Sequence, residues 1–417
     1  MNKISVKEVV KNLIFSFFSY ALPTAVLQFI VQPILANKLG GELNGQYLTL
    51  ISLNFFIISI TATVLNTVRM LQDAEYKKKN LVGDFNVLFI FYALLIVVAL
   101  PVGFMLYTGA FNFVEMALYA VIGLLYLYHD YIFAEYRLSL KYNKILINNV
   151  ILVIGYAIGT LVFLFLVPYW QIVFIIPYAM SAVYDYCNTT FIKEPLKRTP
   201  MFGETRKKVL LLTGSNILSS SVTYCDKLLL YPLLGGLCVS VYNTAALVGK
   251  MLIMLASPLQ SVLLSYLVKM DDLKVKFNKK FVLLGSGLLV FAYGACVLVG
   301  YPLIHLLYPE WAGQSFQFVP VTVASSILML INNLLNTVII RFRKMSSQIV
   351  IQAIDLAVYL VCTLVLVYFF SLWGFCIGIL LATFIKMLIL ISVICFFKPK
   401  ETVAENTIIE EQEKEQK

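Results

Sequence analysis

Charged residues are scarce in this chain: Asp, Glu, Lys and Arg make up 13% of it, against about a quarter in ordinary soluble domains. Hydrophobic residues make up 60%. These proportions exclude a soluble globular fold and predict an all-α polytopic membrane protein. The net charge of +10 does not indicate nucleic acid as a partner, because the basic residues gather in one set of loops.

Histidine is almost absent, and the two residues, His129 and His305, are too few for a histidine-based metal centre. The seven cysteines lack metal-ligand spacing, so we interpret them as small apolar residues. A glycine-rich phosphate loop and a Ser/His/Asp set are also missing. We therefore predict a protein that is not an enzyme and uses no cofactor. Any transport energy comes from an ion gradient, from consumption of the substrate downstream, or from neither.

Twelve apolar segments are each long enough to cross a bilayer as a helix. The first contains polar residues and Pro23 and has no small-residue cleavage site, so we predict a retained helix and not a signal peptide. The segments, numbered as spans 1 to 12, lie at 12–36, 45–69, 85–108, 114–137, 146–167, 171–192, 209–234, 239–268, 281–307, 316–340, 349–370 and 374–397.

The loops on the side of the N-terminus hold 28 of the 32 Lys and Arg residues, whereas the opposite side holds only Lys38. The positive-inside rule then places both termini in the cytoplasm. The external loops are short, so no domain outside the membrane is expected and the function must lie in the helix bundle. The acid-rich segment 398–417 is predicted to be a disordered cytoplasmic tail.

The chain contains a faint internal repeat. Leu39-Gly40-Gly41 followed by Tyr47 recurs 195 residues later as Leu234-Gly235-Gly236 followed by Tyr242. We infer a duplication with six spans per half, which keeps the halves in the same orientation and places a substrate site between them. The predicted parts are an N-terminal six-helix lobe at 1–192, a cytoplasmic linker at 193–208, a C-terminal six-helix lobe at 209–397 and the tail at 398–417.

Ionisable residues inside spans are functional candidates, because hydrocarbon does not tolerate an unpaired charge. Span 7 contains Asp226 and Lys227, and span 8 contains Lys250 on the same helical face as Asn243. We predict that Lys250, Lys227 and Asn243 bind substrate. Asp226 is predicted to act in coupling or gating. Its position allows an ion pair with Lys250, which is either a static bridge or a contact that switches during transport.

Span 1 and the end of span 2 add three further substrate-binding candidates. Gln28 and Gln32 present amides of the kind that bind sugar hydroxyls. Arg69 is either an interfacial anchor or a contact for an anionic headgroup.

Four more residues are predicted to act in coupling or gating: Asp130, Asp185, Asp355 and His129, a side chain that titrates near neutral pH. The alternative for the end of span 4 is a polar end solvated by lipid headgroups. Lys386, midway through span 12, either snorkels or faces the bundle. With so many deep aspartates, the site is expected to be mixed and not purely cationic.

Several stretches resemble one transporter family. They are LANKLGGELNGQYLTLIS after span 1, Asp226-Lys227 running into PLLGGLCVSVYNTAALV, and RFRK at the end of span 10. Together with two six-span halves, they resemble the polysaccharide-transporter branch of the multidrug/oligosaccharidyl-lipid/polysaccharide exporter superfamily. The nearest likeness is to Wzx-type flippases of O-antigen and capsule repeat units. The resemblance implies twelve transmembrane helices in two parallel-repeat six-helix lobes, with a MATE-like architecture.

The resemblance also implies an activity. A flippase of this kind moves an undecaprenyl-pyrophosphate-linked oligosaccharide from the cytoplasmic to the external leaflet of the bacterial cytoplasmic (inner) membrane, by alternating access. Its partners would be the lipid-linked oligosaccharide, membrane lipids, a proton or sodium ion, and the polymerase and chain-length proteins of a lipopolysaccharide or exopolysaccharide pathway. No nucleic acid and no metal are expected.

Two other functions remain open. A drug/cation antiporter of the same superfamily would favour an acidic cavity without lysines, which Lys227 and Lys250 argue against. A membrane-embedded glycan polymerase or acyltransferase would need a sizeable external loop with Arg or His, which the sequence does not offer.

Overall fold

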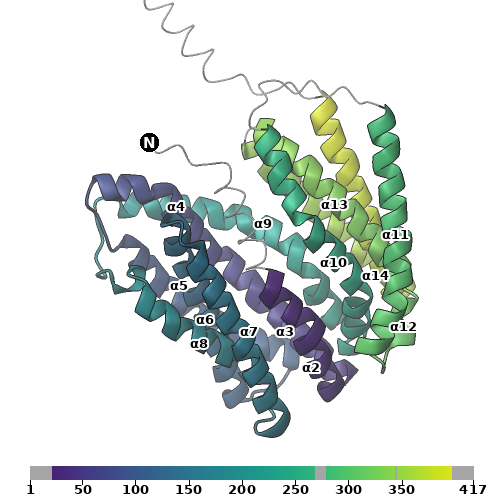
Figure 1. Cartoon of the computed structure of the whole chain (residues 1–417), viewed down its shortest axis with the longest axis horizontal. Coiled ribbons are helices and arrows are strands. Elements are labelled where there is room, and N and C mark those ends of the chain that lie inside the picture. Colours follow the sequence, from purple (N-terminus) through teal and green to yellow (C-terminus); the bar gives the residue numbers. More distant parts are fainter. Residues whose placement is uncertain (1–20, 268–278, 343–344, 397–417) are drawn as a thin grey trace, which may run out of the picture. The chain divides into compact units, whose positions relative to one another are not determined.

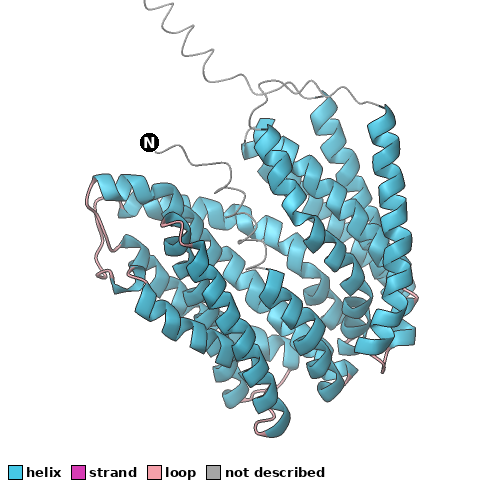
Figure 2. Cartoon of the chain, in the orientation of Figure 1, coloured by secondary structure: helices cyan, strands magenta, loops and turns pink. Residues whose placement is uncertain are grey.

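The computed structural model describes residues 21–267, 279–342 and 345–396, and helix is the only regular secondary structure in them (Figure 2). The elements, labelled in Figure 1 where there is room, are η1 (Leu27–Val31), α2 (Gln32–Leu39), α3 (Gly41–Ile60), α4 (Ala62–Lys78), α5 (Asp84–Thr108), α6 (Phe113–Leu138), α7 (Tyr142–Phe165), α8 (Ile172–Asn188), η2 (Phe191–Lys193), α9 (Phe202–Leu234), α10 (Gly236–Leu267), α11 (Lys279–Leu307), α12 (Ala312–Phe316), α13 (Val319–Phe342) and α14 (Met345–Phe396).

Every predicted span contains helix in the described residues. Span 1 continues through a π-helical turn, η1, into α2, and span 2 corresponds to α3 with the start of α4, which are separated at Thr61. Spans 11 and 12 are the two parts of α14, joined at Ser371, whose φ of 48° and ψ of −130° are not helical. By length and hydropathy, eight helical stretches of the described chain can cross a bilayer, and Gln348–Cys395 is long enough to do so twice. The chain is a multi-pass membrane protein.

The chain folds into two compact units. The first consists of Met1–Thr244 and Leu303–Ser315, and the second of Ala245–Pro302 and Phe316–Lys417. Since α9 and the first turns of α10 pack with the N-terminal helices, this division passes inside α10 and α11. The lobes at 1–192 and 209–397 rest on the sequence repeat and stay a prediction. The last seven residues of the predicted linker form the start of α9, and the predicted tail lies outside the described residues.

In the first unit, α3 packs against α5 and α9, while α6 packs against α4 and α8. The most extensive helix contact is between α7 and α8, which approach through small residues. A Cβ added to Gly155 would lie 2.3 Å from the Cα of Pro177, and one added to Gly159 would lie 3.0 Å from the Cα of Val173. The two parts of α14 in the second unit approach in the same way, at Gly374 and Gly378. These glycines are structural, because they permit backbone contact between helices.

The two copies of the repeated Leu-Gly-Gly turn have nearly the same backbone conformation. Gly40 has φ 76° and ψ 166°, and Gly235 has φ 86° and ψ 174°. Each ends its helix by a bond from its own N–H to the carbonyl four residues earlier, at 2.9 Å. A positive φ is reached easily only by glycine, which explains why both copies have one there. The shared turn supports a duplication.

Candidate functional site

The starts of α3 and α10 close on each other at the predicted external end of the first unit. The Glu42 carboxylate accepts hydrogen bonds from the backbone N–H groups of Gly236 and Leu237, both at 2.8 Å, and so caps the N-terminus of α10. A Cβ added to Gly45 would lie 1.8 Å from the carbonyl oxygen of Gly236. The backbones of the two helices therefore touch directly.

Buried polar bonds continue this contact. The amide of Asn44 donates to the Ser240 hydroxyl at 2.9 Å, and that hydroxyl donates to the carbonyl of Gly41 at 2.6 Å. Trp311 Nε1 donates to the hydroxyl of Thr244 at 2.9 Å. The sequence predicts the repeated turn but not that Glu42 bonds to its second copy. The only signal is that Glu42 follows the first Gly-Gly pair where the second copy has Leu237.

Asp185 of α8 is fully buried and is held by three donors. One carboxylate oxygen accepts from the Tyr136 hydroxyl at 2.8 Å and from the Asn148 amide at 2.7 Å. The other accepts from the Ser181 hydroxyl at 3.3 Å. Three donors from α6, α7 and α8 therefore surround one carboxylate, as a buried charge requires.

His129 of α6 completes this cluster. Its Nδ1 lies 2.9 Å from the Ser181 hydroxyl and 3.9 Å from a carboxylate oxygen of Asp185. The ring packs against Phe133 and, edge to face, against Tyr178. Among the described residues, this histidine is the one basic group within 4 Å of the Asp185 carboxylate. The structure thus joins two residues that the sequence proposed separately, and we name the group of His129, Tyr136, Asn148, Ser181 and Asp185 the histidine–aspartate cluster.

Asp130 follows His129 in the chain but has other partners. Its carboxylate accepts from the hydroxyl of Thr63 at 2.7 Å, and its backbone carbonyl accepts from the amide of Asn66 at 2.6 Å. Successive residues on a helix point about 100° apart, so Asp130 faces α4 while His129 faces α8. Asp130 and Thr63 are not fully buried and can meet a ligand.

Four aromatic rings line up next to this carboxylate. Tyr126 and Tyr178 stack with centroids 3.9 Å apart, Phe55 meets Tyr126 edge to face at 5.3 Å, and Phe55 stacks on Tyr224 at 6.3 Å. These residues belong to α3, α6, α8 and α9, and we call them the aromatic ladder. The sequence analysis did not find it, because the four positions are far apart in the chain.

Arg69 is buried in the middle of α4, and its guanidinium has several partners. Its guanidinium donates to the Tyr131 hydroxyl at 2.6 Å and forms an ion pair with Glu194. It also lies over the ring of Phe191, 3.5 Å from the centroid. These contacts attach the segment after α8 to the helices before it. Arg69 thus has a structural role in the described state, and a substrate contact stays a prediction.

The predicted linker is held by further bonds that the sequence analysis did not expect. Asp84, fully buried at the start of α5, accepts from the backbone N–H of Thr199 at 2.6 Å and from its hydroxyl at 2.5 Å. Asn86 donates to the carbonyls of Phe191 and Glu194, both at 2.9 Å. The segment from Phe191 to Thr199 is therefore fixed to the first unit instead of spanning a solvated gap.

Asp226 and its neighbour Lys227 lie on α9. Asp226 is 8% exposed, and one carboxylate oxygen accepts from the backbone N–H of Lys227 at 2.8 Å and lies 3.8 Å from its ammonium. Asp226 and Lys250 belong to different units, and their pairing stays a prediction.

The remaining candidates lie on α2, η1, α10 and α14. Gln28 and Gln32 are half-buried, Asn243 is buried in the first unit, and Lys250 is half-buried in the second. Asp355 is buried and forms an ion pair with Lys386, N to O 2.5 Å, between the two parts of α14. For Lys386, which the sequence leaves either snorkelling or facing the bundle, the structure supplies a carboxylate partner. The substrate and coupling roles of all these residues stay predictions.

No family model matches the sequence, and no curated protein matches it. Several solved structures are similar to this one. An inward-facing multidrug-resistance MATE transporter aligns with 12% identity over 90% of this chain and 96% of that chain, with a TM-score of 0.68. The lipid II flippase MurJ in an inward closed conformation aligns with 14% identity over 93% of this chain and 88% of that chain, with a TM-score of 0.69. A transporter from Pyrococcus furiosus with a binding pocket of reversed polarity aligns at 14% identity over 92% and 94%, with a TM-score of 0.60.

The chain has the fold that these solved structures share. This result confirms the predicted fold class, an all-α polytopic membrane protein with a MATE-like architecture. The similar structures are transporters and a flippase. The exporter-superfamily fold itself hosts both drug export and lipid flipping, so the substrate has to be argued from the side chains.

Proposed function

We propose that this protein is a flippase that moves an undecaprenyl-pyrophosphate-linked oligosaccharide from the cytoplasmic to the external leaflet of a bacterial inner membrane. The observation that carries the proposal is that each of two deep carboxylates lies beside a lysine. Asp226 has Lys227 beside it, and Asp355 is paired with Lys386. A drug/cation antiporter needs surplus negative charge, and these lysines cancel it. An anionic, sugar-bearing lipid is the better match.

The aromatic ladder and its surroundings suit the sugar portion. Sugar rings present C–H faces that pack on aromatic rings, and their hydroxyls need hydrogen-bonding groups. Phe55 and Tyr224 are half-buried, and the hydroxyl of Thr63 and the carboxylate of Asp130 are exposed enough to bond a ligand. For the pyrophosphate, Lys227 and Lys250 are the proposed cations, with Asn243, Gln28 and Gln32 as amide partners.

The first unit is closed at its predicted external end, as alternating access requires of a state that does not open to the outside. The Glu42 cap and the Gly41, Gly45 and Gly236 contact close α3 onto α10 at the predicted external side. Release of substrate into the external leaflet then requires these bonds to break. Each is a charge-assisted bond worth roughly 1.5–3 kcal/mol, small enough to break and re-form during a transport cycle.

A proton is the coupling ion that the histidine–aspartate cluster supports best. Asp185 is buried without a permanent cation among the described residues, so its charge is balanced only by a proton on the carboxylate or on His129. The groups that face the carboxylate are O–H and N–H donors, from Tyr136, Asn148 and Ser181. A sodium ion would need several oxygen acceptors in their place.

The decisive experiment is transport by the purified protein in proteoliposomes. A fluorescent undecaprenyl-pyrophosphate-linked oligosaccharide should become accessible to an added glycosidase on the opposite leaflet, whereas a cationic dye should not be moved. Tyr224→Ala and Phe55→Ala should slow this flipping about tenfold each, since loss of one stacked ring costs roughly 1–1.5 kcal/mol. Phe91→Ala is the matched control, because Phe91 is an exposed ring on α5. Dye export without flipping would overturn the proposal in favour of the antiporter.

A further inference from the structure

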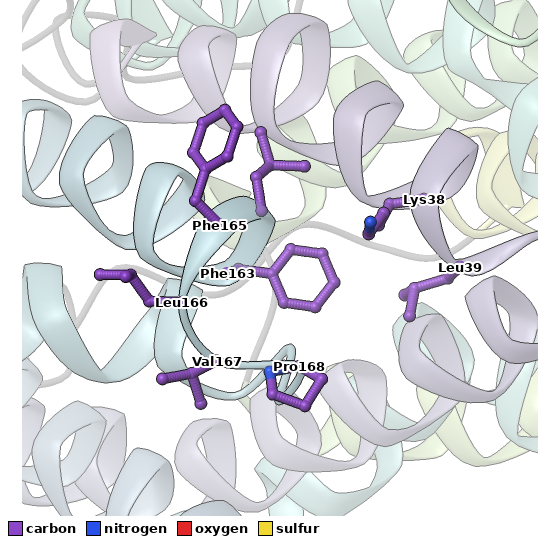
Figure 3. Close-up of a pocket in the computed structure, with 8 residues that line it drawn as sticks. Lys38, Leu39, Phe163, Phe165, Leu166, Val167 and Pro168 are labelled. Atoms are coloured by element: carbon purple, nitrogen blue, oxygen red, sulfur yellow. The ribbon is translucent and has the colours of Figure 1, made fainter.

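A pocket opens where the end of α2 meets the turn after α7 (Figure 3). Its volume is about 330 Å³. Figure 3 shows the ring of Phe163 in the middle of this pocket, with Lys38 and Leu39 on one side and Pro168 below. The lining residues are Lys38, Leu39 and the continuous run Phe163, Leu164, Phe165, Leu166, Val167 and Pro168, and we call the site the Lys38 pocket.

Lys38 is the only polar side chain in this lining and is exposed. No carboxylate of the described residues lies within 4 Å of its ammonium, in contrast to Lys77, Lys79 and Lys208, which each pair with an acid one turn away. A lysine at the end of a membrane helix, beside apolar residues, lies at the depth of lipid phosphates. An anion from outside the chain can therefore bind its ammonium without competition from a carboxylate of the described residues.

A row of exposed apolar side chains leads along α7 to this pocket. Ile147, Ile154, Ile158, Leu161 and Phe165 follow one another at spacings of seven, four, three and four residues, so they share one face of the helix. A different face of α7 packs on α8 through Gly155 and Gly159. The exposed face therefore meets lipid, and it runs the length of an acyl chain.

We propose that the Lys38 pocket binds the phosphate headgroup of a phospholipid in the external leaflet, with one acyl chain lying along the exposed face of α7. The phosphate contacts the ammonium of Lys38, and the glycerol and upper acyl carbons contact Phe163, Leu166 and Pro168. The lining offers no hydroxyl, carboxylate or amide side chain. A sugar headgroup would lose its hydrogen bonds there, so the occupant is a membrane phospholipid and not the transported substrate.

The test measures lipid retained by the purified full-length protein in native mass spectrometry, after exchange into micelles that contain phosphatidylglycerol. Lys38→Gln should lower retention about fivefold, since one lysine near a membrane surface contributes ~1 kcal/mol toward an anionic lipid. Lys38→Arg should retain it. Lys141→Gln is the matched control, because Lys141 is an exposed lysine at the other end of α7.

A second arm uses a neutral diacylglycerol glycolipid without phosphate. Wild-type protein should retain it less than phosphatidylglycerol, and Lys38→Gln should not change that retention. Equal loss of phosphatidylglycerol in Lys38→Gln and Lys141→Gln would overturn the proposal, and so would glycolipid retention equal to that of phosphatidylglycerol. Neither result depends on flipping, so this test of lipid binding is independent of the test of the proposed transport function.

Discussion

Asp185 and Asp355 are both buried aspartates of membrane helices, yet the protein stabilises them in opposite ways. Asp355 has a permanent cation, Lys386, at 2.5 Å. Asp185 has three neutral donors and, at 3.9 Å, a histidine whose charge depends on protonation. The charge at Asp355 therefore has a lysine as its counter-charge, whereas the charge at Asp185 is balanced only when a proton is present.

This difference separates a structural charge from a functional one. Burying an ion pair is tolerable if its geometry is good, and such a pair ties two helices together. Burying a carboxylate with neutral donors leaves a group whose protonation can change with the surroundings. A coupling site needs the second arrangement. Three of the four variants that follow test this distinction, and Arg69→Gln adds a second buried ion pair for comparison. They are given in order of their expected effect on the free energy of unfolding.

Lys386→Met should have the largest effect. It leaves the Asp355 carboxylate buried without its partner, and breaking a buried pair in this way costs about 3–5 kcal/mol. Lys386 lies inside a candidate membrane span, where bulk water screens the loss less than at a protein surface. The measurement is reversible unfolding of the purified protein in mixed micelles. The double variant Lys386→Met with Asp355→Asn should recover most of the stability; if it is as unstable as the single variant, the charge balance is not what matters.

Arg69→Gln should rank second. The guanidinium forms the ion pair with Glu194, a hydrogen bond to Tyr131 and the contact with Phe191 that fix the segment after α8. Loss of these contacts should lower the free energy of unfolding by about 2–3 kcal/mol, less than for Lys386 because the carboxylate left without its partner, Glu194, is less buried than Asp355. Lys77→Gln, on the same helix but in an exposed pair with Asp73, is the control and should change stability by less than about 0.5 kcal/mol.

The sequence was sufficient for the fold class because hydropathy and the distribution of basic residues follow directly from the bilayer as solvent. The predicted spans and the repeated Gly-Gly turn both come from such local patterns. Candidate residues were also found locally, as charges inside apolar runs. What could not be predicted was which charges meet. Lys386 lies 31 residues from Asp355, and no pattern links them.

The least predictable contacts join residues far apart in the chain. Glu42 bonds to Gly236 across 194 residues, and Asp84 bonds to Thr199 across 115. Both acids occupy ordinary sequence positions, one after a glycine turn and one at the start of a helix. Both accept from backbone N–H groups, which every residue other than proline has, and Asp84 also accepts from the Thr199 hydroxyl. Side-chain chemistry therefore gave no signal for these two contacts.

Asp185→Asn should separate function from stability. The amide can still accept from Tyr136 and pair with Ser181, so the free energy of unfolding should change by no more than about 1 kcal/mol. Flipping driven by an imposed pH gradient should nevertheless fall at least about tenfold, because the variant cannot exchange the proton. Asp355→Asn paired with Lys386→Met is the control and should keep the response to the gradient. A gradient response in Asp185→Asn would place proton coupling elsewhere.

His129→Gln should have the smallest effect on stability, about 0.5 kcal/mol, because its amide can replace Nδ1 in the bond to Ser181. The carboxylate of Asp185 still takes up a proton, so flipping should continue to respond to the gradient. The flipping rate should fall severalfold, since His129 is no longer present to relay the proton between Asp185 and the less buried side of α6. Proton uptake and flipping measured together on the same proteoliposomes provide the test. If the two fall by the same factor in His129→Gln and in Asp185→Asn, the two residues act as one titrating unit, and the carboxylate alone is not the coupling group.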